Sequence, residues 1–241
     1  MNLKNHDHFI NIQKYLIFFL PISLIIGSAA ININIVLIDI LFLIFFFFKK
    51  IDLKKIVKKT LILIFLFLLI NNLFSLHTDL SLRGTLGLIK HILLFLALVT
   101  FFEQNSIHRN VFYKIILFTV LAASIDTLVQ YSFGMSITGS TPQESHGYRL
   151  SGPFGTEYVV GAYLSKLLYI GLITIYLNSP KNIYSFLYLI WMVGIVFLTN
   201  ERSAFYISIL SLFGLLVLFR ASIGFKFIII CVVISLGSIL L

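Results

Sequence analysis

The sequence predicts an all-α protein: a polytopic bundle of about nine transmembrane helices. Three observations predict it. The chain is 59% hydrophobic and 11% charged, its mean hydropathy is +1.04, and long apolar runs follow one another from end to end. A water-soluble domain does not have this composition. A lipid-exposed backbone must satisfy its own hydrogen bonds, so the apolar runs are expected to be helices. We therefore treat residues 1–241 as a single transmembrane helical domain.

The apolar runs set the order of the predicted spans. The last run stops at Leu241 without flanking polar residues, so we expect a C-terminally truncated reading frame. The predicted spans are residues 15–30, 34–48, 60–76, 84–102, 111–132, 154–177, 183–199, 203–219 and 226–241.

The distribution of Lys and Arg predicts the topology. The loop 49–59 carries six lysines and is expected to be cytoplasmic, because cytoplasmic loops are rich in Lys and Arg. Alternation from there places the N-terminus in the cytoplasm and the polar loop 134–153 in the periplasm. Thirteen of the eighteen Lys and Arg then fall on the cytoplasmic side. The net charge of +9 is explained in this way, without nucleic acid as a partner.

Five basic residues depart from this topology. Each lies on the outer side or in the outer half of a span, where a topology signal would not place it. Each could be an anchor whose charge reaches the interface, but the five together favour an anionic ligand. They are Arg83, Lys90, Arg149, Lys166 and Arg202.

Span 84–102 begins with a basic stripe. Arg83, Gly87, Lys90 and His91 have the spacing of one helical face. A basic stripe that descends from the outer leaflet suits a lipid-linked phosphate or diphosphate. The alternative is an intramembrane ion pair between Lys90 and Asp126 of the next span, and both can hold.

The polar segment 134–157 lies between long apolar runs and is the strongest candidate site, because polar clusters in membrane bundles are costly to keep. Gly152 and Gly155 let a ligand approach the backbone closely. Arg149 precedes a predicted helix start, where the backbone N–H groups favour an anion. We expect Thr156 or Ser151 to cap this helix, with Glu157 in its first turn. The alternative is an ordered loop that only caps span 154–177.

Three further patterns lie near this segment. Asp126 and Gln130, followed roughly by Gly134, share the face of span 111–132 that leads to it. Gly161 and Ser165 form a small-residue pattern that is typical of helix packing. The turn 199–203 places Arg202 on the same predicted side as Arg149.

Several chemistries have no motif in this chain. The six histidines form no ligand pair in a span, and Cys231 is the single cysteine, so we expect no metal. A phosphate-binding P-loop, a dinucleotide fingerprint and a serine nucleophile elbow are all missing from the sequence. We expect no cofactor, and any reaction would take its energy from the substrate.

The segments 149–157 and 161–164, together with 198–204, resemble the O-antigen ligase and polymerase family of the bacterial inner membrane. That family has an R-x-x-G-x-F-G-x-x stretch that opens a span, and a T-x-S-R-G/S-A turn after the following span. In this chain Glu201 replaces the usual small residue before the Arg. The segment 126–131 also fits, and the resemblance covers about residues 60–240.

The resemblance implies an enzyme of the inner membrane that acts on its periplasmic face. It would transfer a glycan from undecaprenyl diphosphate to lipid A–core or to another lipid-linked repeat unit, with no metal or cofactor. Arg149 and Arg202 would hold the diphosphate and stabilise the leaving group, with Arg83 and Lys90 assisting. The family's catalytic base would lie in a loop beyond Leu241, so the base is unassigned and the present chain is expected to be inactive.

Two other classes stay open. A transporter or flippase for an anionic lipid or solute would be favoured by charges at the membrane midplane and by broken helices. A structural or assembly protein of the membrane is the third.

Overall fold

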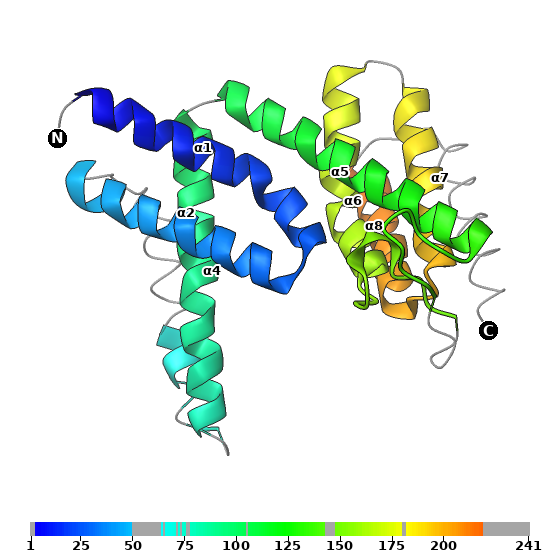
Figure 1. The fold of residues 1–241 in the computed structure, drawn as a ribbon, viewed down its shortest axis with the longest axis horizontal. Helices are drawn as coiled ribbons and strands as arrows, with labels where there is room; N and C mark the ends of the chain where they lie inside the picture. The colour runs from blue at the N-terminus through cyan, green and yellow to red at the C-terminus, as the bar shows by residue number, and fades with distance from the viewer. Residues whose placement is uncertain are drawn as a thin grey trace. The chain divides into compact units, whose positions relative to one another are not determined.

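The computed structural model describes residues 3–49, 64, 66–70, 72, 74–75, 78–104, 106–142, 148–179 and 182–218. These residues are helical apart from their connections and contain no strand (Figure 1). They divide into two compact units, Met1–Phe112 and Tyr113–Leu241. The helices are α1 (Leu3–Ile26), α2 (Ser28–Lys49), α4 (Thr78–Gln104), α5 (Ser106–Phe133), the 3-10 helix η2 (Gly152–Phe154), α6 (Val160–Asn178), α7 (Asn182–Leu198) and α8 (Arg202–Leu218).

The all-helical fold class is confirmed for the described residues, and their composition supports a membrane protein. Among the described residues, three helical segments are long and apolar enough to cross a membrane: Ser28–Phe47, Ile107–Phe133 and Val160–Asn178. Asn11–Ile26 and Ile183–Leu198 are shorter apolar helices. The count of nine spans remains a prediction. About half of span 60–76, nearly all of the basic loop 49–59 and all of span 226–241 lie outside the described residues.

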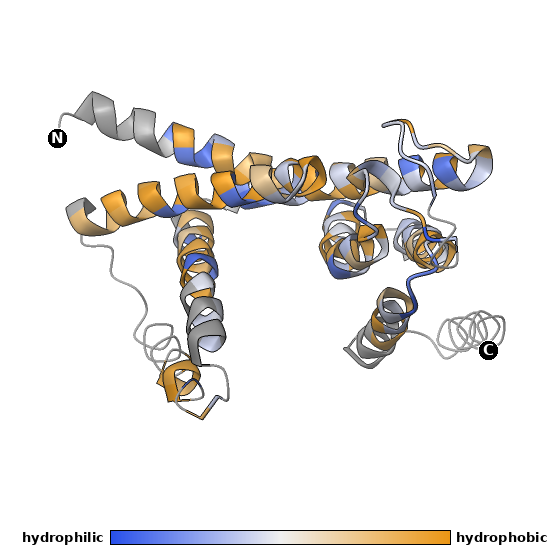
Figure 2. Ribbon diagram, turned by 60° about the horizontal axis from the view of Figure 1, so that its bottom comes forward, coloured by the Kyte–Doolittle hydropathy of each residue, from blue (hydrophilic) through white to orange (hydrophobic). Residues whose placement is uncertain are grey.

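In the first unit, α1 and α2 form an antiparallel hairpin, and α4 packs against α2 (Figure 1). The hairpin turns at Gly27, whose φ of 134° is accessible to glycine but strained for other residues. The predicted break between residues 30 and 34 was therefore wrong by several residues. Buried Asn34 of α2 fastens the pair, since its Nδ2 donates to the Leu16 carbonyl and to Ser23 Oγ, each at 3.2 Å. Figure 2 shows α2 as a largely hydrophobic helix.

In the second unit, α6 packs against both α7 and α8, and these two pack against each other. Gly171 of α6 lets Tyr188 of α7 come close. A Cβ added at Gly171 would lie 2.0 Å from the Tyr188 hydroxyl oxygen and 2.6 Å from Cζ. Small residues at such contacts are how membrane helices gain close packing.

We expect Gly171→Ala to lower the free energy of unfolding by about 1–3 kcal/mol, because an extra methyl group in a packed contact forces neighbouring atoms apart. The matched control is Gly194→Ala in α7, where an added Cβ meets nothing within 4 Å. Reversible unfolding in mixed detergent micelles measures both variants. Equal losses at the two positions would contradict the packing role of Gly171.

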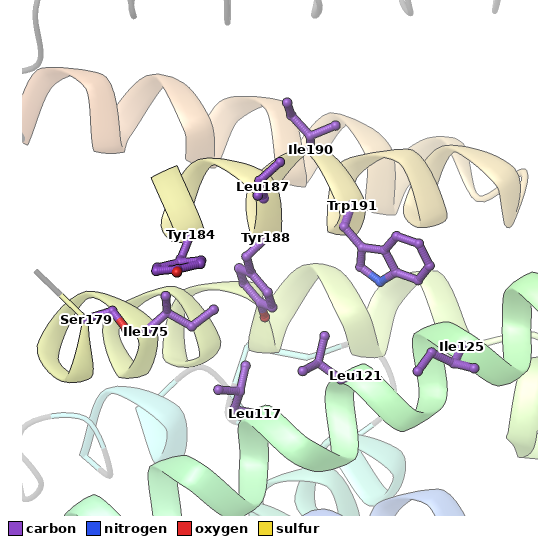
Figure 3. A pocket seen from close by; sticks show the side chains of 10 residues that line it. All are labelled: Leu117, Leu121, Ile125, Ile175, Ser179, Tyr184, Leu187, Tyr188, Ile190 and Trp191. Atoms are coloured by element: carbon purple, nitrogen blue, oxygen red, sulfur yellow. The ribbon is translucent and has the colours of Figure 1, made fainter. Parts of the chain in front are cut away.

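An apolar groove of ≈ 820 Å³ opens between α5, α6 and α7. Figure 3 shows Tyr188 and Trp191 of α7 beside Leu117, Leu121 and Ile125 of α5. The Trp191 indole Nε1 donates to Ser124 Oγ at 2.8 Å, so its polar atom is satisfied inside the unit. Because its lining is apolar, the groove is compatible with hydrocarbon chains. It includes the end of α6 at Ser179, whereas the polar segment 134–157 leads into the opposite end of that helix.

Candidate functional site

Gln130 anchors the polar segment to the end of α5. Its side chain is fully buried. Nε2 donates to the Ser140 carbonyl at 3.1 Å and to Ser151 Oγ at 3.2 Å. Oε1 accepts from the backbone N–H groups of Ser151 at 3.0 Å and Gly152 at 2.8 Å. One amide thus joins two stretches of the segment, on either side of residues 143–147.

Asp126 lies one helical turn before Gln130 and holds the first part of the segment. Its Oδ1 accepts from the Ile137 N–H at 2.6 Å, and its buried Oδ2 has no hydrogen-bond partner among the described residues. Ser140 closes the same stretch, because its Oγ donates to the Gly152 carbonyl at 2.7 Å. The predicted shared face of Asp126 and Gln130 is confirmed, and that face binds the protein's own loop.

Gly152 and Gly155 differ in their surroundings. Gly152 is buried with φ of 53°, and a Cβ placed there would lie 2.5 Å from Thr127 Oγ1. The close approach predicted for a ligand at Gly152 is therefore made by α5 itself. Gly155 has φ of 65°, is exposed, and has nothing within 4 Å of a built Cβ.

Helix α6 begins at Val160, six residues after the predicted start of the span. Pro153 and the positive φ of Gly155 fit the short η2 helix and a turn in place of a first helical turn. The predicted caps were wrong. Neither Thr156 nor Ser151 caps α6, and Glu157 lies before its first turn with an exposed side chain.

The carboxylate at the start of α6 comes from Glu201, in the turn between α7 and α8. The Gly161 N–H donates to Glu201 Oε1 at 2.9 Å, and the Ala162 N–H donates to Oε2 at 3.1 Å. Each oxygen therefore satisfies one N–H that the helix leaves without an internal partner. Glu201 is only 4% exposed. A carboxylate is also favoured there by the helix dipole.

The contact between Glu201 and α6 requires a glycine. A Cβ at Gly161 would lie 2.6 Å from Thr199 Oγ1 and 3.0 Å from Glu201 Cβ. The turn is fixed locally as well, since Thr199 Oγ1 donates to the Val196 carbonyl at 2.7 Å. Asn200 has φ of 58°, a conformation that Asn tolerates better than most residues. The predicted packing role of Gly161 is thus confirmed, with the turn 199–201 as its partner.

Two cations act on Glu201 from different elements. Burial raises the pKa of the Glu201 carboxyl above its usual range. The two backbone N–H groups and the charges of Arg149 and Lys166 oppose this rise in pKa, without cancelling it. Arg149 belongs to the polar segment and Lys166 to α6, so the cations that act on Glu201 come from separate parts of the chain.

The charge of Arg149 acts on Glu201, whereas Arg202 follows Glu201 in sequence and begins α8. Arg149 is half-buried, whereas Arg202 and Lys166 are exposed. In the part of the chain that the structure describes, no ion pair joins any of these three cations to a carboxylate. Two of the five predicted basic residues, Arg149 and Lys166, therefore act on Glu201, a residue that the sequence had not indicated as part of the site.

Arg83 and Lys90 belong to α4, in the first unit. Lys90 Nζ donates to Asn32 Oδ1 of α2 at 2.7 Å, and its charge also acts on buried Asp39. The alternative of a Lys90–Asp126 ion pair stays a prediction, because the two residues belong to different units. Asn32 and Asp39 are seven residues apart and therefore share one face of α2. This polar face was the sequence signal that a basic side chain such as Lys90 would pack against α2.

The sequence also indicated that Glu201 and Gln130 could be buried and bonded. Each is a polar residue at the end of a long apolar run, where a buried side chain needs a partner. Their partners lie 39 to 40 and 21 to 22 residues away, which local pattern does not reveal. Among the described residues, no group of three or more His, Cys, Asp and Glu could hold a metal ion.

Comparisons of the chain with protein-family models, with curated proteins and with solved structures found no match. The class of protein therefore rests on the fold: an α-helical protein whose described residues include helices long and apolar enough to cross a membrane.

Proposed function

We propose that the protein transfers a glycan from a polyprenyl diphosphate at the membrane surface, as the O-antigen ligases and polymerases do. The observation that carries this proposal is that the charges of Arg149 and Lys166 both act on buried Glu201, whose carboxylate caps the start of α6. Guanidinium groups hold phosphate oxygens bidentately and keep their charge at any physiological pH. Such a pair of cations suits a diphosphate.

The mechanism that follows is electrostatic. When the bond between sugar and diphosphate breaks, negative charge develops on the leaving diphosphate. Arg149 and Arg202 would stabilise that charge, and in a site with little water this stabilisation is larger than in bulk solution. The acceptor is lipid A–core or a second lipid-linked repeat unit, and its hydroxyl proton goes to a base beyond the described residues.

Backbone strain next to Arg149 supports a functional role. Tyr148 has φ of 57°, in the left-handed region that costs L-residues about 1–2 kcal/mol. Strain of this kind tends to gather at functional sites, where the surrounding structure enforces it. Here Gln130 fixes Ser151 and Gly152, just beyond Arg149.

We expect Arg149→Ala to lower glycan transfer by about 100-fold or more, the loss typical of removing one group that stabilises developing charge. The measurement is surface glycan in cells that express the complete gene, with membrane insertion checked by immunoblot. Arg109→Ala is the matched control, because Arg109 is an exposed arginine near the other end of α5. Normal glycan output from Arg149→Ala would refute the proposal.

A second candidate is transport of an anionic lipid or solute. It is favoured by Asp39, which lies within the most apolar candidate span and near Lys90. Ionisable residues inside a span often mark transport pathways. We expect Asp39→Asn to abolish uptake or flipping if transport is the function, and to leave glycan transfer within about threefold of wild type if transfer is the function.

A further inference from the structure

We infer that the apolar groove between α5, α6 and α7 binds an acyl chain of an anionic phospholipid, with the phosphate of that lipid beside Lys114. The groove includes the end of α6 at Ser179, whereas the polar segment 134–157 leads into the opposite end of that helix. The lipid site therefore lies apart from the residues of the proposed glycan transfer and does not depend on that function.

Two hydrogen bonds fix how the three helices run along the groove. At one end, Thr174 Oγ1 of α6 donates to the Tyr113 carbonyl of α5 at 3.4 Å. At the other end, Trp191 Nε1 of α7 donates to Ser124 Oγ of α5 at 2.8 Å. Figure 3 shows the same order, with Tyr184 toward one end of the groove and Trp191 toward the other. The groove thus follows α5 from the Tyr113 end to the Ser124 end.

The floor of the groove is closed at Gly171 of α6. A Cβ built there would lie 2.0 Å from the Tyr188 hydroxyl oxygen and 3.3 Å from Leu117 Cδ1, so α5 and α7 both reach α6 at this point. Leu187 and Ile190 also line the groove, and their side chains are exposed. The groove is therefore a trough that opens away from α6, on an apolar surface where membrane lipid would lie.

Lys114 supplies a cation at the Tyr113 end. It lies three residues before Leu117, which lines the groove, and residues three apart are neighbours on a helix surface. The Lys114 side chain is exposed, and no ion pair joins it to a described residue. Tyr184 at the same end is also exposed. An ammonium group with three N–H donors and a neighbouring phenol hydroxyl suit the oxygens of a phosphate ester.

The length of the groove matches the depth of one membrane leaflet. Ile125, at the far end, lies eleven residues after Lys114. Eleven residues of α-helix advance by about 16 Å. The hydrocarbon core of a bilayer is about 30 Å thick, so one leaflet is about 15 Å deep. A cation at one end and an apolar trough of this length suit a phospholipid, whose phosphate lies at the interface and whose acyl chain reaches the bilayer middle.

The predicted topology favours a phospholipid over the lipid-linked glycan as the occupant. In that topology the connections before α5 and between α6 and α7 are cytoplasmic, so Lys114 lies at the cytoplasmic leaflet. Anionic lipids of this leaflet attract basic residues near the membrane surface. A glycan carrier that reacts on the periplasmic face would instead meet the end of the bundle that carries the polar segment.

The test uses Trp191, which lines the groove and is the single tryptophan of the chain. Its side chain is 36% exposed, so a quencher in the groove can reach it. The measurement is quenching of Trp191 fluorescence in the full-length protein by brominated acyl chains in vesicles. Brominated phosphatidylglycerol supplies an anionic headgroup, and brominated phosphatidylcholine a neutral one. We expect phosphatidylglycerol to occupy the groove about fivefold more strongly, the preference that one lysine gives near an anionic surface.

We expect Lys114→Gln to abolish this preference and to leave quenching by phosphatidylcholine unchanged, whereas Lys114→Arg keeps the preference. Lys14→Gln is the matched control, because Lys14 loses the same charge but belongs to α1, which does not line the groove. Equal quenching by the two lipids in the wild type overturns the inference, and so does a preference that survives Lys114→Gln.

A different occupant has its own signature in the same experiment. If a second copy of the chain covered the groove, neither brominated lipid would quench Trp191, and sedimentation of the protein in detergent would show a dimer. That result also overturns the inference, whatever the outcome for glycan transfer by Arg149→Ala.

Discussion

Glu201→Ala is expected to lower the free energy of unfolding by about 3 kcal/mol, because two N–H groups at the start of α6 lose charge-assisted hydrogen bonds in a buried position. Glu157→Ala is the matched control. Glu157 is the acidic residue closest to the start of α6 in sequence, yet it is exposed, and we expect a change within about 0.5 kcal/mol. Reversible unfolding in mixed micelles measures both.

The loss at Glu201 should depend on pH. Burial raises the pKa of this carboxyl in the folded protein, so the folded state holds its proton more tightly than the unfolded state. The unfolding free energy of the wild type should therefore fall as pH rises from the ordinary Glu pKa to the raised value, and level off above it. Glu201→Ala lacks this group and should lack that slope. An identical pH dependence in both proteins would show that Glu201 does not titrate as described.

Gln130→Leu is expected to have an effect of similar size, about 3 kcal/mol. Leucine has nearly the same volume but cannot accept from the Ser151 and Gly152 N–H groups, which would stay buried without a partner. The segment that carries Arg149 would also lose its attachment to α5. We expect faster proteolysis between residues 134 and 157 together with the lower stability.

Tyr131→Leu is the control for Gln130→Leu, since Tyr131 is the next residue of α5 and its side chain is exposed. It should change the unfolding free energy by less than about 1 kcal/mol. A proteolysis rate that rises equally in both variants would mean that Gln130 does not anchor the segment.

The sequence predicted the helices well where apolar runs were long. The predicted spans 84–102, 111–132 and 183–199 correspond to α4, α5 and α7, because hydropathy reports the environment of a whole segment. Boundaries were less well predicted at Gly27 and Val160. At both places a glycine with positive φ or a short 3-10 turn ends the regular structure, and such local choices leave little trace in average hydropathy.

The site was predicted in part. Alternation of the spans placed Arg149 and Arg202 on one predicted side, and this convergence stays a prediction; the structure shows that the charge of Arg149 acts on Glu201, the residue before Arg202. The cap of α6 was assigned to the wrong acid, because sequence reasoning favours a neighbour such as Glu157 over a residue 40 positions away. The sequence signal was a glutamate, Glu201, beside Arg202 in a short turn between apolar runs. The partner of Glu201 could not be predicted, because it depends on tertiary packing.

The cap supplied by Glu201 also orders events during synthesis. Ribosomes add roughly 5–20 residues per second, so the 40 residues from Gly161 to Glu201 take roughly 2–8 s. Throughout that interval the start of α6 is present in the nascent chain, and the N–H groups of Gly161 and then Ala162 have no acceptor from Glu201. The first turn of α6 is therefore completed only after α7 has been synthesised and the chain has turned toward α8. A ribosome that stalls before residue 201 would leave the start of α6 hydrated and Arg149 without its nearby carboxylate, a form that membrane proteases could distinguish from the finished protein.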